Sequence, residues 1–192
     1  MELFFDTETS DKFEFKSANY RDKNFPWIVQ LAAVLAHEGI AYAEINFIVM
    51  PEGRTIAEGA QRVHNIDVET AEKFGIKELL VLNSFMALMD KAETIVAHNF
   101  VFDSTMIASV MYRNGYAIQA EDLLYRKPCY CTMQETTELC KLLGKYGHKW
   151  PKLQELHQFL FHEDFVGAHD AMFDIRATMK CYYKLKEDGW IK

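Results

Sequence analysis

The feature that most constrains this chain is an apolar run at its start that leads directly into two acidic residues. Residues 1–10 read MELFFDTETS, so Leu3, Phe4 and Phe5 stand immediately before the Asp6-Thr7-Glu8 tripeptide. The run is typical of a buried β-strand, in which residues two apart share one face. The carboxylates of Asp6 and Glu8 are therefore expected side by side at the end of that strand.

Two carboxylates held this close repel each other, and one is forced to keep a proton unless a cation lies between them. A divalent metal supplies such a cation, and a site built from oxygen ligands alone selects a hard ion such as magnesium or manganese. The Asp-x-Glu pattern is weak on its own, because acidic residues often follow strands. The interpretation as a metal site therefore depends on acidic residues elsewhere in the chain.

Length and composition limit the class of protein. The 192 residues predict one globular domain, 1–192, with a substantial core, since 49% of the residues are hydrophobic. We expect no membrane span and no secretory signal, and we expect a cytoplasmic location. The net charge of −7 argues against a binding module that holds nucleic acid by charge alone.

The cysteines leave two interpretations open. Cys129 and Cys131 are two residues apart, and His148 follows them, which permits a zinc site in principle. Cys140 and Cys181 add no C-x-x-C spacing, so reduced cytosolic thiols are the simpler and preferred interpretation.

The hydrophobic pattern predicts an α/β fold. Residues 27–36 read as a central strand and 42–50 as the next, joined by a short turn and hence antiparallel. Residues 55–92 show helical periodicity in several pieces, and residues 94–98 form a short buried strand. Within the helical region Asp67 is expected to be an N-cap, and one helix is expected to bury a wide stripe of Leu79, Leu80, Leu82, Phe85, Met86 and Met89.

The second half continues in the same way. Residues 128–133 predict another strand, followed by a helix that ends near Gly144 and by a basic, aromatic loop over 145–152. Helices are then expected over 152–161 and from Asp170, as N-cap, to about Glu187. The loop over 145–152 is either a solvated connector or a contact for a nucleic-acid strand, with lysines for phosphates and Tyr146 or Trp150 for stacking.

Two further acids occupy positions like those of the first pair. Asp103 is expected in the first turn of the helix that follows the strand over 94–98, within HNFVFD, and Asp174 lies early in the last helix, within HDAMFD. His169 precedes Asp174 by five residues. Taken singly, Asp103 is most simply an acid favoured by the helix dipole and Asp174 a solvated helix residue. Taken jointly with Asp6 and Glu8, they predict a catalytic site.

The ordered set of motifs resembles the DEDDh branch of 3′→5′ exonucleases, over nearly the whole chain. This resemblance implies a ribonuclease-H-like fold, with a five-stranded mixed sheet flanked by helices. It also implies that Asp6, Glu8, Asp103 and Asp174 bind two Mg²⁺ ions, which Mn²⁺ can replace, and that His169 is the general base. Two divalent cations would then balance the four carboxylate charges, and hydrolysis of a phosphodiester by two metals fits that site.

The same resemblance indicates which residues contact the substrate. Thr7 is expected near the terminal nucleotide, and Thr9 follows where the family commonly has Thr-Gly but this chain has Thr9-Ser10-Asp11. His64 is either a contact for the terminal nucleotide or a surface histidine at a joint between helices. The remaining candidates for substrate binding are each as well explained by a structural role, as the end of a strand or as core packing: His98, Asn99 and Phe102.

The sequence therefore predicts a metal-dependent 3′→5′ exonuclease that releases nucleoside 5′-monophosphates from single-stranded 3′ ends. DNA is preferred, by resemblance to the proofreading members, and an exoribonuclease acting on short or tailed RNA is the alternative. A non-catalytic nucleic-acid-binding subunit is less favoured, because all five catalytic positions are filled. The chain stops at Lys192, right after the last helix, which argues against tethering to a polymerase by a C-terminal extension; a homo-oligomer or another partner stays open.

Overall fold

A mixed β-sheet forms the centre of the computed structural model, which describes residues 1–14, 19–165 and 170–191. Among these residues the sheet has five strands in the order β3-β2-β1-β4-β5. The strands are β1 (Glu2–Thr9), β2 (Ile28–His37), β3 (Ile40–Ile48), β4 (Thr94–Ala97) and β5 (Cys129–Cys131). The pairs β1–β2 and β2–β3 are antiparallel, whereas β1–β4 and β4–β5 are parallel. The predicted five-stranded mixed sheet is confirmed.

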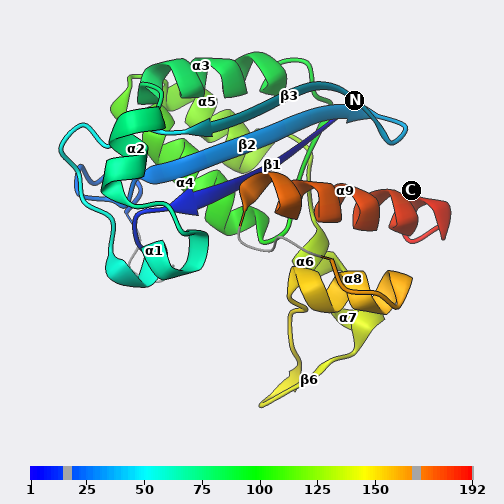
Figure 1. Ribbon diagram of the computed structural model, residues 1–192. Helices are drawn as coiled ribbons and strands as arrows, with labels where there is room; N and C mark the ends of the chain where they lie inside the picture. The colour runs from blue at the N-terminus through cyan, green and yellow to red at the C-terminus, as the bar shows by residue number, and fades with distance from the viewer. Residues whose placement is uncertain (15–18, 166–169, 192) are drawn as a thin grey trace.

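Helices cover both faces of this sheet (Figure 1). They are α1 (Glu58–His64), α2 (Val68–Phe74), α3 (Glu78–Met89), α4 (Phe100–Arg113), α5 (Ala117–Glu121), the π-helix η1 (Asp122–Arg126), α6 (Thr132–Glu135), α7 (Thr137–Cys140), α8 (Leu153–Phe161) and α9 (Ala171–Glu187). Asp67 and Asp170 cap α2 and α9 as predicted, by accepting backbone N–H bonds at their side chains.

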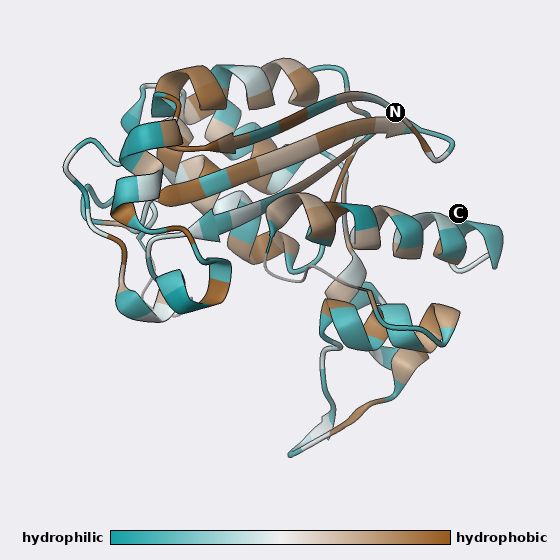
Figure 2. Cartoon of the chain, in the orientation of Figure 1, coloured by the Kyte–Doolittle hydropathy of each residue, from teal (hydrophilic) through white to brown (hydrophobic). Residues whose placement is uncertain are grey.

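Alternation along β1 divides the core into two layers. Leu3 and Phe5 point to one face and pack in the cluster that includes buried side chains of α3 and α4, whereas Phe4 points to the other face. There Phe4 packs with Ile175 and Tyr182 of α9. Because both faces are covered, β2 is apolar at nearly every position, and it is coloured as hydrophobic along most of its length in Figure 2. The ribonuclease-H-like architecture thus places the end of β1 between α4 and α9.

Two sequence-based expectations about helices are wrong. Helix α3 buries Val81, Leu82, Phe85 and Met89, but Leu79 and Leu80 of the predicted stripe are exposed. The helix predicted to end near Gly144 is instead two short helices, α6 and α7. The residues after them form a small antiparallel hairpin of β6 (Leu143–Gly144) and β7 (Gly147–His148), where a loop was expected.

Two global features complete the description. None of the helices built by the described residues has the length and apolar character needed to cross a membrane. The four cysteines are all free thiols, with Cys129 exposed and the other three buried.

Candidate active site

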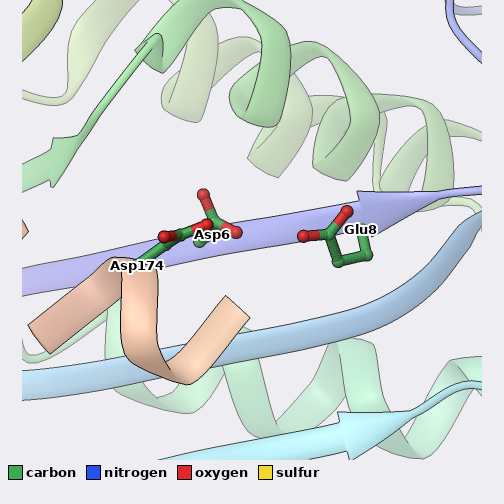
Figure 3. Close-up of side chains that lie close together, drawn as sticks. All are labelled: Asp6, Glu8 and Asp174. Atoms are coloured by element: carbon green, nitrogen blue, oxygen red, sulfur yellow. The ribbon is translucent and has the colours of Figure 1, made fainter. Parts of the chain in front are cut away.

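Three carboxylates converge where β1 meets the start of α9. Oxygen atoms of Asp6, Glu8 and Asp174 all lie within 4.8 Å of one another (Figure 3). Asp6 and Glu8 share a face of β1 because they are two residues apart. Asp174 is held in the first turn of α9, and the side chain of Asp170 fixes that turn by accepting bonds from the N–H groups of Met172 (3.0 Å) and Phe173 (3.3 Å). The structure thus brings together three of the four predicted metal ligands.

The fourth predicted ligand, Asp103, lies beside this cluster in the first turn of α4, with only 3% of its surface exposed. Its Oδ1 accepts two hydrogen bonds from Thr7, one from the backbone N–H at 3.0 Å and one from the hydroxyl at 2.7 Å. Hydrogen bonds to a charged group are stronger than neutral ones, so Thr7 holds the carboxylate in one orientation. Asp103 lines the same cavity as the cluster without belonging to it.

Crowding of these acids disturbs their ionisation. Burial, and next the charge of Asp103, raise the pKa of Asp6 well above its usual range. Burial, together with the charges of Asp174 and Asp103, raises the pKa of Glu8 from 4.5 to about 8. Carboxylates that are buried this close to one another are stabilised by a positive charge between them. A site in which every ligand atom is an oxygen is suited to hard divalent cations. The residues present therefore fit a divalent metal site.

The carboxylates open into a cavity of about 600 Å³. Four of the six predicted substrate contacts line it: Thr7, His98, Asn99 and Phe102. Phe102 lines the cavity and also stacks on Phe13, with ring centroids 5.0 Å apart.

The other two predicted contacts, Thr9 and His64, are not among the residues that line the cavity. The Thr9 hydroxyl donates to the carbonyl of Asp11 at 2.9 Å. His64 is buried, and its Nδ1 accepts a bond from the N–H of Ile66 at 3.1 Å. Both side chains therefore stabilise the chain around the ends of β1 and α1.

His98 is a structural bridge within the cavity wall. Its Nδ1 lies 2.9 Å from the Thr132 hydroxyl and its Nε2 lies 3.1 Å from the carbonyl oxygen of Pro151. Burial lowers the pKa of His98 to about 4, so the ring is neutral near neutral pH. His98 thus ties the end of β4 to the segment before α8 and positions that segment against the cavity.

The structure adds cavity residues from that same segment. Trp150, Pro151 and Lys152 line the cavity; four further lining residues outside the earlier prediction are Met133, Leu153, Gln154 and Phe165. The sequence carried a signal for Trp150 and Lys152, since both belong to the basic, aromatic stretch that was one candidate for a strand contact. The predicted general base, His169, lies outside the described residues.

Of two sequence comparisons with known proteins, one gives a match. The family model described as "Exonuclease" matches residues 3–182. A comparison with curated protein sequences found no significant match.

Similar solved structures are exonuclease I proteins. E. coli exonuclease I in complex with a dA16 oligonucleotide has a TM-score of 0.76 at 20% identity, over 97% of this chain and 40% of that chain. A zinc-bound complex of the E. coli enzyme with single-stranded DNA has a TM-score of 0.73 at 21% identity, with the same coverage. Exonuclease I from Methylocaldum szegediense has a TM-score of 0.71 at 17% identity, again over 97% and 40%. These likenesses show a shared fold, and this chain spans about 40% of the length of those proteins.

Proposed function

The chain belongs to the exonuclease family, which confirms the predicted DEDDh type and class of enzyme, and we propose that it hydrolyses single-stranded DNA from the 3′ end. The products are nucleoside 5′-monophosphates, and the whole of 1–192 acts as one exonuclease domain. The observation that carries the proposal is the cluster of Asp6, Glu8 and Asp174, whose oxygens lie within 4.8 Å of one another at the wall of a cavity.

We propose that this cluster, with Asp103 beside it, holds two divalent cations, with Mg²⁺ as the natural ion and Mn²⁺ as a substitute. Bound metal supplies a nucleophilic water near neutral pH and neutralises the charge on the leaving oxygen. The protein's own part is to hold the ligands, and the two bonds from Thr7 keep Asp103 aimed at the cavity. His169 is the proposed general base for the attacking water, because of its position five residues before Asp174.

The substrate assignment is supported by the structural relatives. E. coli exonuclease I has been seen with dA16 and dT13 oligonucleotides, so DNA is preferred here over RNA. The strand would enter the cavity beside Asn99 and Phe102, with its terminal nucleotide near Thr7. Aromatic rings such as Phe102 suit a single strand because each base offers a face for stacking.

The test is a time course on two 3′-labelled oligonucleotides of one sequence, one DNA and one RNA, with magnesium and then with EDTA. We expect magnesium-dependent release of labelled mononucleotide, faster from DNA, and loss of that activity in Asp174→Asn. Asp90→Asn, which changes an exposed acid at the end of α3, is the matched control and should retain the rate. Faster release from RNA would reassign the substrate, and binding without cleavage would indicate a non-catalytic subunit.

A further inference from the structure

The hairpin formed by β6 and β7 is an exposed projection that has no role in the proposed function as described so far. Figure 1 shows it extending beyond α7 and α8, away from the sheet. Leu143 pairs with His148 and Gly144 with Gly147, which leaves Lys145 and Tyr146 at the turn. Tyr146 is 91% exposed and Leu143 is 85% exposed. Large apolar surfaces that project into water often mark a contact with a partner.

The charge of the hairpin identifies the kind of partner. Residues 141–152 read KLLGKYGHKWPK, which is four lysines and a histidine without one acid, in a chain whose net charge is −7. Glu138 pairs with His148 at 2.9 Å and Glu155 pairs with Lys149, so part of this charge is balanced locally. At the turn, the Lys145 ammonium lies 5.1 Å from the centre of the Tyr146 ring. Lysines alternating with exposed aromatic rings are suited to a single-stranded polyanion, with phosphates on the lysines and bases on the rings.

The hairpin is continuous with the candidate active site. Trp150 and Lys152, at its base, line the cavity that holds the carboxylates, and the bond from His98 to the Pro151 carbonyl fixes that base. Trp150 is nevertheless 58% exposed, so it faces both the cavity and solvent. A strand whose 3′ end occupies the cavity can therefore pass directly onto the hairpin.

The length of the path sets how much strand it can contact. Trp150 follows Tyr146 by four positions, and an extended chain of four residue steps spans at most about 14 Å. A stacked single strand advances about 3.4 Å per nucleotide, so this distance corresponds to roughly four nucleotides. A dinucleotide in the cavity is too short to contact the turn of the hairpin, whereas a strand of about fifteen nucleotides contacts it easily.

We propose that the β6–β7 hairpin is a second contact for the single strand, about four nucleotides to the 5′ side of the cavity. Tyr146 stacks on a base there and Lys145 contacts a phosphate, while Trp150 marks the exit from the cavity. This inference rests on the proposed function, because it assigns the strand a direction out of the same site. Its consequence is a preference for longer substrates.

The experiment compares kcat/KM for a dinucleotide and a fifteen-nucleotide DNA strand with the same 3′ end, in magnesium. Tyr146→Ala should lower the ratio of the long to the short substrate by about tenfold, the loss expected for one base–aromatic stack. Tyr125→Ala removes a similarly exposed tyrosine, 74% exposed on η1 and outside the cavity lining, and should leave the ratio at the wild-type value. Lys145→Ala should reduce the slope of log affinity against log salt concentration by about one.

Several outcomes would overturn the inference. An unchanged ratio in Tyr146→Ala means that the hairpin does not contact the strand, and a protein partner would then be the better explanation of its exposed rings. An equal loss on both substrates would mean that the substitution disturbs the cavity itself. If the wild-type protein cleaves neither substrate, the proposed function fails. In that case the contact with the hairpin is tested separately, by measuring binding of the labelled fifteen-nucleotide strand in EDTA by fluorescence anisotropy. Weaker binding by Tyr146→Ala than by Tyr125→Ala supports the contact, and equal binding by the two variants refutes it.

Discussion

Replacing Glu8 by glutamine should stabilise the metal-free protein, although it removes a proposed metal ligand. Burial and the charges of Asp174 and Asp103 raise the pKa of Glu8 from 4.5 to about 8, so the folded chain holds a proton that the unfolded chain releases. A carboxyl with a raised pKa in the folded state weakens folding as the pH rises through the interval from 4.5 to about 8. Glutamine has nearly the same shape and cannot ionise, so it escapes this penalty.

The size of the effect follows from the interval between the two pKa values. Each pKa unit corresponds to about 1.4 kcal/mol. Ionisation of Glu8 therefore lowers the free energy of unfolding by about 4 kcal/mol near pH 8 and by only about 1 kcal/mol near pH 5. Glu8→Gln should be more stable than the wild type by about those amounts when metal is absent.

The assay is urea unfolding in EDTA at the two pH values, followed by tryptophan fluorescence or circular dichroism. Glu72→Gln, an exposed position on α2, is the matched control and should show no such pH-dependent gain. Saturating magnesium should remove the advantage of Glu8→Gln, because the cation stabilises the wild-type cluster more than the variant. A Glu8→Gln protein that is no more stable than the wild type near pH 8 in EDTA would refute the electrostatic account of this site.

Three other predictions concern the residues around the cluster. Thr7→Val removes the 2.7 Å hydroxyl bond to Asp103 and should lower the free energy of unfolding by about 2 kcal/mol in magnesium. Thr7→Ser keeps the hydroxyl and should retain the stability of the wild type, and equal urea midpoints for the two variants would contradict this. His98→Ala releases the Pro151 carbonyl and should raise KM more than it lowers kcat. Because the pKa of His98 is already lowered to about 4, the pH–rate profile between about pH 6 and 9 should keep its shape, and a lost ionisation there would show that His98 transfers protons. Magnesium or manganese should raise the melting temperature more near pH 8 than near pH 5, since protons compete for the carboxylates, and a pH-independent shift in calorimetry would argue against the cluster as the binding site.

Local patterns in the sequence were sufficient for much of the scaffold. The apolar start of β1 and its period of two place Asp6 and Glu8 on one face without any knowledge of the rest of the fold. The caps at Asp67 and Asp170 were likewise predictable, because an N-cap side chain bonds to N–H groups only two or three residues away. Interactions of this range depend on covalent geometry, so they can be deduced from neighbouring residues.

Elements decided by competition for buried surface were less predictable. Leu79 and Leu80 fit an apolar stripe on α3 by composition, yet neither lies on the face of α3 that is buried, and both remain exposed. The stretch over 145–152 reads as a basic, aromatic loop, but pairing of Leu143 with His148 makes its first half part of a hairpin. Gln30, a polar residue within the apolar strand β2, also has a partner that only folding brings near: its side-chain amide donates a hydrogen bond to the Asn46 side chain on the neighbouring strand, at 2.9 Å.

By itself, the sequence determined the identity and order of the acids, the strands and helices that carry them, and hence the family. Only the tertiary structure decided that Thr7 fixes Asp103 across 96 residues of chain, and that His98 is neutral and bonded to Pro151. It also decided that the basic hairpin adjoins the cavity, through Trp150 and Lys152. The physical reason is that side-chain periodicity follows from backbone geometry over a few residues, whereas the walls of a cavity are set by packing between segments that only folding brings together.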